Sequence, residues 1–219
     1  MDSLVIYGAG GHGKVVADAA LTSGRFVLGF VDDSLERGTD VCFGLKVLSK
    51  GLQNFFRWYK AAAESNSYTN MPTVVVAIGD NKIRKDALLW LMGCGIEITT
   101  VIHPFSKVSE SSSIGIGTVV LPGAVINPSC SIGRGVIINT SSSIDHDSVI
   151  EDYVHISPGA HLGGNVVIKE GTHISIGCSV RDKVCIGKES VVGVGSVVVK
   201  DVPERVVAYG CPAKIQKEL

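Results

Sequence analysis

The sequence predicts a small α/β domain of Rossmann-like type over residues 1–102, followed by a parallel β-helix over residues 103–219. Two observations support this order. In the second half of the chain, aliphatic residues recur at every sixth position, which is the repeat of a β-helix. In the first half, a short apolar run enters a glycine-rich turn that leads into a helical segment, as in the first βαβ unit of an α/β sheet.

The six-residue repeat continues from Ile102 to Val198 without a shift in register. Neither the 3.6-residue period of a helix nor the two-residue period of a strand places one apolar residue every six positions. Three repeats form one triangular coil, so residues 18 positions apart stack at the strand spacing of about 4.8 Å. Seventeen aliphatic residues are therefore expected to point inward: Ile102, Val108, Ile114, Val120, Ile126, Ile132, Ile138, Ile144, Ile150, Ile156, Leu162, Ile168, Ile174, Val180, Ile186, Val192 and Val198.

Small residues occupy a second set of inward positions, four residues after each aliphatic one. From Ser106 to Ser196 these positions hold only Ser, Thr, Ala, Val or Cys, as expected where the prism narrows at a corner. Glycine or asparagine often precedes the small residue, and both tolerate the positive φ of a sharp corner. These corner residues are Gly117, Gly123, Gly135, Gly159, Asn165, Gly171, Gly177 and Gly195. No coil buries its core alone, so the prism is expected to fold as one unit.

The N-terminal part alternates between strands and helices. We expect strands over residues 3–7, 26–31, 45–48, 73–78 and 96–102, and helices over residues 14–23 and 81–92. In the second helix, Ile83, Leu88, Trp90 and Leu91 have the spacing of a face that packs in the core. Residues 49–70 are polar and weakly patterned, and their role stays open.

The glycine-rich turn fits the pattern G-x-G-x-x-G at Gly8, Gly10 and Gly13, and Asp32 follows Gly13 by 19 residues. Glycines at this spacing let the backbone approach a phosphate at a helix N-terminus. A dinucleotide site and an NAD-linked oxidoreductase are disfavoured, because the segment is about half of a dinucleotide-binding domain and suits one nucleotide. A turn that only packs the helix on the sheet is the alternative.

Composition excludes several classes of function. The net charge is −1 and 45% of the residues are hydrophobic, whereas binding to nucleic acid requires a basic surface. No stretch approaches the roughly 18 apolar residues of a membrane span. The six cysteines form no C-x-x-C pair, and Cys130 and Cys178 fall on small inward positions. A reduced, cytoplasmic setting is therefore expected.

His146 is the strongest candidate for a catalytic residue. It lies on the outer surface just before a corner, between Asp145 and Asp147, and the residue 18 positions later is Gly164. A histidine beside a carboxylate is the usual composition of a general base, and a glycine above it leaves room for a ligand. A solvated surface histidine is the alternative. His155 and His173, which also stack, are expected to form a polar ladder and no metal site, because a third ligand is lacking.

The repeat and several longer fragments resemble a known family. The fragments are Tyr-Gly-Ala-Gly-Gly-His-Gly (7–13), Val-Asp-Asp (31–33), Ala-Ile-Gly-Asp-Asn-Lys-Ile-Arg-Lys (77–85), Ile-Asn-Thr-Ser-Ser (138–142), Asp-His-Asp (145–147) and His-Ile-Ser-Pro-Gly-Ala-His-Leu-Gly-Gly-Asn-Val (155–166). They are similar to the sialic-acid O-acetyltransferase-like group of hexapeptide acyltransferases, which N-acetylate nucleotide-linked amino sugars of bacterial surface glycans. The resemblance implies a left-handed β-helix. Residues 208–214 also resemble the G-x-P-A-[KR] closure of these enzymes, which implies a C-terminal cap that contacts the coenzyme.

The resemblance also implies roles for individual residues. His146 would be the general base, Asp147 would orient it with Asp145 as the second choice, and the Gly164 N–H would stabilise the oxyanion. Substrate-binding residues would be Gly10, Gly11, His12, Asp32, Asp33 and Asn139, with the phosphates at residues 10–12 and the base or ribose at the two aspartates. Residues that bind acetyl-CoA would be His155, Gly164 and Ile176.

The implied reaction is direct acetyl transfer from acetyl-CoA, with no metal. Related enzymes are homotrimers whose active sites lie between subunits, and apolar residues on the prism faces agree with such an assembly. An O-acetyltransferase of a sugar such as sialic acid and a non-enzymatic sugar-nucleotide-binding protein are the alternatives. The sequence leaves open which nucleotide and which amino sugar are used.

Overall fold

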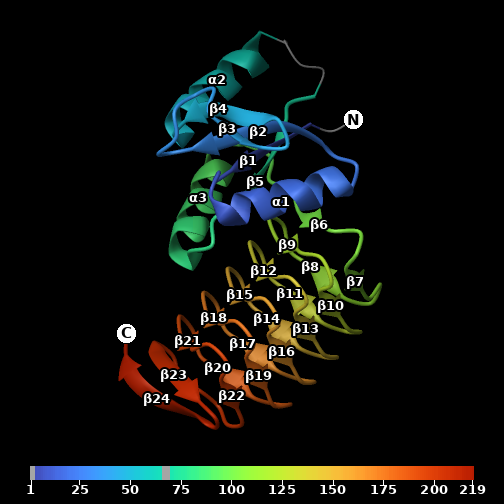
Figure 1. Cartoon of the computed structure of the whole chain (residues 1–219), viewed down its shortest axis with the longest axis vertical. Helices are drawn as coiled ribbons and strands as arrows, with labels where there is room; N and C mark the ends of the chain where they lie inside the picture. Colours follow the sequence, from blue (N-terminus) through green and yellow to red (C-terminus); the bar gives the residue numbers. More distant parts are fainter. Residues whose placement is uncertain (1–2, 66–69) are drawn as a thin grey trace. The chain divides into compact units, whose positions relative to one another are not determined.

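The computed structural model describes residues 3–65 and 70–219 and divides into two compact units, Met1–Val101 and Ile102–Leu219 (Figure 1). The first unit is an α/β domain. The second consists of short parallel strands in three sheets and fits the predicted left-handed parallel β-helix. The predicted fold class is therefore confirmed. Among the described residues, no helix combines the length and the apolar character needed to cross a membrane.

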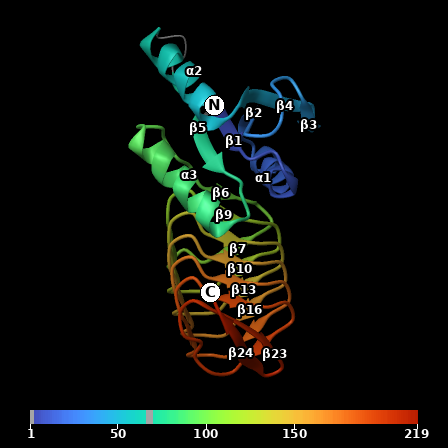
Figure 2. The same ribbon diagram turned by 90° about the vertical axis from the view of Figure 1, so that its left-hand side faces the viewer.

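The N-terminal unit is built on a five-stranded sheet of order β3-β4-β2-β1-β5. Its strands are β1 (Ser3–Tyr7), β2 (Phe26–Asp32), β3 (Asp40–Cys42), β4 (Leu45–Lys50) and β5 (Thr73–Val76), and only β3 pairs antiparallel. Its helices are α1 (Gly11–Thr22), α2 (Leu52–Glu64) and α3 (Asn81–Gly93). Helix α1 lies on one side of the sheet and α2 and α3 on the other (Figure 2), as right-handed crossovers in opposite directions from β1 require.

The N-terminal unit differs from the expectations in three places. Residues 49–70, which the sequence analysis left open as weakly patterned, contain helix α2, in which Leu52, Phe55, Phe56 and Tyr59 have helical spacing; residues 66–69 lie outside the described part. The strand expected over 96–102 is reduced to a single bridge at Ile98 and to β6 (Val101–Ile102). In α3, Leu88 and Leu91 are buried, but Ile83 and Trp90 are exposed.

The β-helix unit stacks two-residue strands at 18-residue intervals. One sheet contains β7 (Lys107–Val108), β10 (Val125–Ile126), β13 (Ser143–Ile144), β16 (His161–Leu162), β19 (Ser179–Val180) and β22 (Val197–Val198). A second contains β8 (Ser113–Ile114), β11 (Ser131–Ile132), β14 (Val149–Ile150), β17 (Val167–Ile168) and β20 (Cys185–Ile186). The third contains β6, β9 (Val119–Val120), β12 (Ile137–Ile138), β15 (His155–Ile156), β18 (His173–Ile174), β21 (Val191–Val192), β23 (Val206–Gly210) and β24 (Ala213–Glu218).

The predicted inward ladder forms the core of this unit. From Val120 to Val198 every sixth residue is buried, and each such side chain contributes about 1.5–3 kcal/mol by the apolar area that it removes from water. The first coil is less well covered: Val108 and Ile114 are half-buried and Ile102 is 40% exposed. At the other end, the hairpin of β23 and β24 pairs with β21, and Val206 and Ala208 join the core. The hairpin therefore closes the C-terminal end of the core.

The small inward residues also join neighbouring coils by hydrogen bonds. The hydroxyls of Ser112, Thr118 and Thr172 each donate to the backbone carbonyl 15 residues later. The buried thiols of Cys130 and Cys178 do the same, at 3.1 Å from the carbonyl oxygens of Asp145 and Gly193. These side chains therefore hold the corner of the next coil from the inside.

All eight corner residues predicted to adopt positive φ do so. Six residues other than glycine and asparagine also adopt it at equivalent positions, although for ordinary residues this conformation costs about 1–2 kcal/mol. They are Ser129, Ser141, Asp147, Tyr153, Lys183 and Glu189. From Gly117 to Gly195 the repeat geometry thus imposes a left-handed residue at each of these corner positions, whatever its side chain.

We predict that Ile150→Ala lowers the free energy of unfolding by about 2–5 kcal/mol, because it leaves a cavity in a fully covered coil. Ile102→Ala, in the same kind of position but partly exposed, should cost less than half as much. Denaturant unfolding of both variants measures the difference. Equal losses would contradict the view that the core is formed by the stack of coils.

Candidate active site

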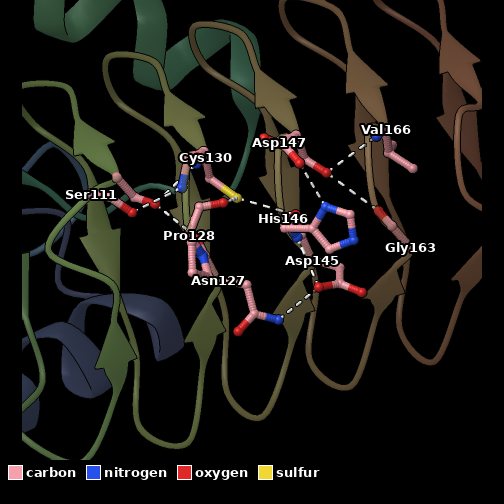
Figure 3. Close-up of polar contacts among 12 residues, drawn as sticks. Ser111, Asn127, Pro128, Cys130, Asp145, His146, Asp147, Gly163 and Val166 are labelled. Carbon is pink, nitrogen blue, oxygen red and sulfur yellow. Dashed lines mark hydrogen bonds and ion pairs between the residues drawn. The ribbon is translucent and has the colours of Figure 1, made fainter.

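His146 lies at a corner of the prism, two residues after strand β13. Its Nδ1 is 2.7 Å from Oδ2 of Asp147, and both side chains are about half exposed. Figure 3 shows the imidazole between Asp145 and Asp147. A carboxylate only accepts hydrogen bonds, so the proton of the neutral ring lies on Nδ1 and the lone pair on Nε2. The ring is therefore oriented as a general base.

The positive φ of Asp147, 59°, explains why this carboxylate reaches the ring. The hydrogen bond to Asp147 is the main cause that raises the pKa of His146 above its ordinary value, and the charge of Asp145 adds to it. Asp145 plays a different part. Its Oδ1 accepts from the His146 N–H at 2.8 Å and from Nδ2 of Asn127 at 2.9 Å. Asp145 thus holds the backbone of His146, and Asp147 holds its side chain.

Gly164 lies directly against the imidazole, as the 18-residue stacking predicted. A β-carbon at Gly164 would come within 2.8 Å of both Cε1 and Nε2 of His146. Any other residue at position 164 would therefore displace the ring or close the space beside Nε2.

The Gly164 N–H is available as a hydrogen-bond donor. In the coil, the N–H two residues after each inward aliphatic residue takes no part in the strand ladder, and proline occupies this position at 104, 122, 128 and 158. Among the described residues, the Gly164 N–H has no acceptor. An N–H beside the base, in reach of ligands, is the kind of donor that stabilises an oxyanion.

His155, Asn139 and Ile176 lie on another part of the prism. His155 is on β15, in the sheet of β12 and β18, whereas His146 follows β13 in a different sheet. The imidazoles of His155 and His173 stack in parallel with centroids 4.7 Å apart, so the predicted ladder is present. The His155 ring is also 3.1 Å from the amide nitrogen of Asn139. Ile176 is exposed.

The glycine-rich loop separates into structural and open positions. A β-carbon at Gly13 would lie 2.0 Å from the Gly8 carbonyl oxygen, and Gly8 has φ of 108°. These two glycines are needed for the turn itself. Gly10 and Gly11 have no atom within 4 Å of a β-carbon position, and helix α1 begins there without a side-chain cap. The N-terminus of α1 therefore has free space beside the N–H groups of its first turn, as an anion requires.

His12 follows in the first turn of α1. Burial, together with the charge of Arg84, lowers the pKa of His12 to about 4, so the ring is neutral near pH 7. Arg84 is itself buried and donates to the carbonyl oxygens of Ile78 and Gly79 at the end of β5. The loop therefore has a neutral hydrogen-bonding ring and a buried positive charge nearby.

Asp32 has both carboxylate oxygens occupied by the chain. Oδ2 accepts from the Ala9 N–H at 2.9 Å, and Oδ1 accepts from the N–H groups of Ser34 and Leu35 and from the Ser34 hydroxyl. Burial raises the pKa of Asp32, but these hydrogen bonds outweigh it, so the pKa lies below its ordinary value. Asp32 thus fastens the glycine-rich loop to the end of β2.

Asp33 borders a hollow of about 540 Å³ within the N-terminal unit. Tyr7, Gln53, Asp86 and Trp90 also line this hollow. The Tyr7 hydroxyl donates to Oδ2 of Asp33 at 2.6 Å. Burial and this bond raise the pKa of Tyr7. The sequence did not predict that residues of α2 and α3 line this hollow, because α2 was not predicted and Trp90 was placed in the core. No group of three or more metal-ligating side chains occurs among the described residues.

Comparison with known proteins gives consistent matches over the whole chain. The family model described as PglD N-terminal domain matches residues 3–91. The acetyltransferase domain of PglB from Neisseria gonorrhoeae is 34% identical with a TM-score of 0.86, and the match covers 99% of this chain and 100% of that one. Its complex with acetyl coenzyme A is 35% identical with a TM-score of 0.85 and 98% of each chain covered.

A histidine-to-asparagine mutant of perosamine N-acetyltransferase from Caulobacter crescentus, in complex with CoA and GDP-perosamine, is 33% identical. Its TM-score is 0.89, and the match covers 100% of this chain and 98% of that one. The comparison with curated proteins gives no match.

We predict that Asp147→Asn lowers the pKa of His146 more than Asp145→Asn does, since the direct hydrogen bond to Asp147 is the larger influence. The carboxylates of Asp145 and Asp147 stabilise the protonated imidazole of His146, and this raises its pKa. Removing either carboxylate must therefore shift the titration of His146 to lower pH. NMR titration of the His146 ring protons measures both shifts. A larger shift in Asp145→Asn would contradict the assignment of Asp147 to the ring.

Proposed function

The chain belongs to the PglD family of acetyl-CoA-dependent sugar N-acetyltransferases, and from that premise we propose that it acetylates the amine of a nucleotide-linked amino sugar. Two relatives above 30% identity, each matched over at least 98% of both chains, carry the family assignment, which confirms the resemblance seen in the sequence. One of these relatives is described in complex with CoA and GDP-perosamine. The observation that carries the proposed mechanism is the contact of His146 with Gly164.

In the proposed mechanism, Nε2 of His146 takes a proton from the sugar amine as the nitrogen attacks the thioester carbonyl. The carbonyl oxygen becomes an oxyanion that accepts a hydrogen bond from the Gly164 N–H. The C–S bond then breaks, and the CoA sulfur leaves with the proton returned from His146. Asp147 stabilises the imidazolium that forms in between. The chain supplies base and oxyanion donor in adjacent coils.

The coenzyme site supports a homotrimer with active sites between subunits. Asn139, His155 and Ile176 are proposed to contact substrate or coenzyme. They lie on or just after strands of one sheet, whereas His146 follows a strand of another. A second subunit that places these residues opposite His146 would complete the site. The cytoplasmic location and the coenzyme contact of the C-terminal hairpin stay predictions.

In the N-terminal unit, we assign the diphosphate to the N-terminus of α1, at Gly10, Gly11 and His12. The hollow beside Asp33 suits the nucleobase, because the carboxylates of Asp33 and Asp86 would repel a phosphate and accept from base N–H groups. Trp90 offers an aromatic face for stacking. Asp32 acts indirectly, since its oxygens already hold the loop.

Thiol release from acetyl-CoA, measured with a panel of nucleotide-linked 3- and 4-amino sugars, tests the proposed function. We expect one amino sugar to stimulate release, and His146→Ala to lower kcat about 10²–10⁴-fold, the usual loss for a general base. His161→Ala is the matched control, because His161 is an exposed histidine one coil away with a hydrogen bond to Ser143. Stimulation only by hydroxyl sugars would indicate an O-acetyltransferase instead, and release unaffected by His146→Ala would refute the mechanism.

Gly164→Ala separates the proposed site from the fold. Gly164 does not have positive φ, so alanine should leave stability within about 0.5 kcal/mol of the wild type. Its methyl group would collide with the His146 ring, and we expect activity to fall at least tenfold. Gly163→Ala is the contrasting variant, since its methyl group would lie 2.7 Å from the Asp182 backbone nitrogen. That variant should lose stability. Full activity of Gly164→Ala, measured by thiol release, would contradict the proposed site.

A further inference from the structure

Ser148 lies one coil before the peptide that carries the proposed oxyanion donor. Its side chain is fully buried in a small inward position. The hydroxyl donates to the Gly163 carbonyl oxygen at 3.3 Å and accepts from the Val166 N–H at 3.1 Å. Gly163 and Val166 appear beside His146 in Figure 3. Ser148 therefore contacts the reaction site only through the backbone, from inside the prism.

The geometry of the peptide bond gives this contact a consequence at the outer surface. In a trans peptide the C=O and the N–H of the same unit point in opposite directions. The Gly163 carbonyl points inward to Ser148, so the Gly164 N–H on the same peptide points outward. A hydrogen bond accepted by the carbonyl also polarises the N–H and strengthens it as a donor.

The other residues of this inward column show that the fold does not require a donor here. Val166 and Val184 occupy the next two positions of the column, 18 and 36 residues after Ser148, and both are buried. In the coil before, the Cys130 thiol donates to the Asp145 carbonyl at 3.1 Å, on the peptide that carries the His146 N–H. Ser112, one coil earlier still, makes the same kind of bond to the Asn127 carbonyl, on a peptide whose nitrogen belongs to Pro128 and has no N–H. Donors thus occupy the column from Ser112 to Ser148, including the positions behind both peptides of the site, and valines fill the column beyond it.

We propose that Ser148 is a positioning residue for acetyl transfer: its hydroxyl fixes and polarises the Gly163–Gly164 peptide so that the Gly164 N–H meets the oxyanion. The inference rests on the proposed function of Gly164. It involves no contact of Ser148 with the substrate or coenzyme.

Three substitutions of Ser148 and one control test the role. Ser148→Ala and Ser148→Val both remove the hydroxyl donor. Valine is also the residue found at the next position of this column, Val166, so the Ser148→Val variant is expected to fit the fold. We expect kcat to fall about tenfold in both, less than the 10²–10³-fold loss of a whole oxyanion donor, with the KM for acetyl-CoA nearly unchanged. Ser148→Cys should recover part of the rate, because Cys130 makes the same kind of bond. Ser190→Ala is the matched control: the Ser190 hydroxyl also donates to a carbonyl, that of Pro203, and accepts from the Val206 N–H. It should keep the wild-type kcat.

An NMR measurement on the protein without substrate keeps the two proposals separate. The Gly164 amide proton should move upfield in Ser148→Ala and Ser148→Val and stay in place in Ser190→Ala. An unchanged Gly164 amide, or an unchanged kcat in both Ser148 variants, would overturn the role of Ser148 while the proposed function stands. If the amide moves but no amino sugar stimulates thiol release in the wild type, the proposed function fails and the orientation of the peptide by Ser148 stands alone.

Discussion

The parallel pairing of each short strand with the strand 18 residues later is the constraint on which the rest of the β-helix depends. The pairing runs without a break through all three sheets. It aligns the inward ladder and, in the same step, places Gly164 against the ring of His146. A single inserted residue between them would turn the following side chains to the opposite face. Stability and site geometry therefore depend on the same register.

The corners of the coil are the places where backbone groups are not paired in the strand ladder. Along the strands, the N–H and C=O groups are paired in the strand ladder, and the side chains that point inward are buried in the core. At the corner, the N–H two residues after the inward aliphatic residue is left over. Some coils fill that position with proline, and at Arg134 and His146 an aspartate side chain accepts from it. The Gly164 N–H has no acceptor in the described part of the chain and lies beside His146, a corner histidine that Asp147 orients.

Much of this arrangement could be predicted because the repeat is explicit in the sequence. Counting in steps of 18 was enough to place His146 against Gly164 and His155 against His173. Counting could not show that Asp147 binds the ring and Asp145 the backbone, because that division depends on the positive φ of Asp147. Counting in steps of 18 also could not reveal that Arg84 is buried. Arg84 is one of the buried residues of α3, where only apolar residues were expected. Helix α2 was missed although Leu52, Phe55 and Phe56 have helical spacing, because the polar residues around them hid that spacing.

The glycine-rich loop has the sequence of a dinucleotide-binding motif, but its acidic residue has a different role. In a dinucleotide site, the acid at the end of the second strand is free to bind the ribose. Here the corresponding acid is Asp32. One of its oxygens accepts a hydrogen bond from the Ala9 N–H, and the other accepts from the Ser34 N–H in the turn after β2. What remains open is the N-terminus of α1 at Gly10 and Gly11, and the hollow beside Asp33. A helix N-terminus with free space and a hollow beside Asp33, within half of a dinucleotide-binding domain, agree with the proposal of a single nucleotide, which is the form in which an activated amino sugar is carried.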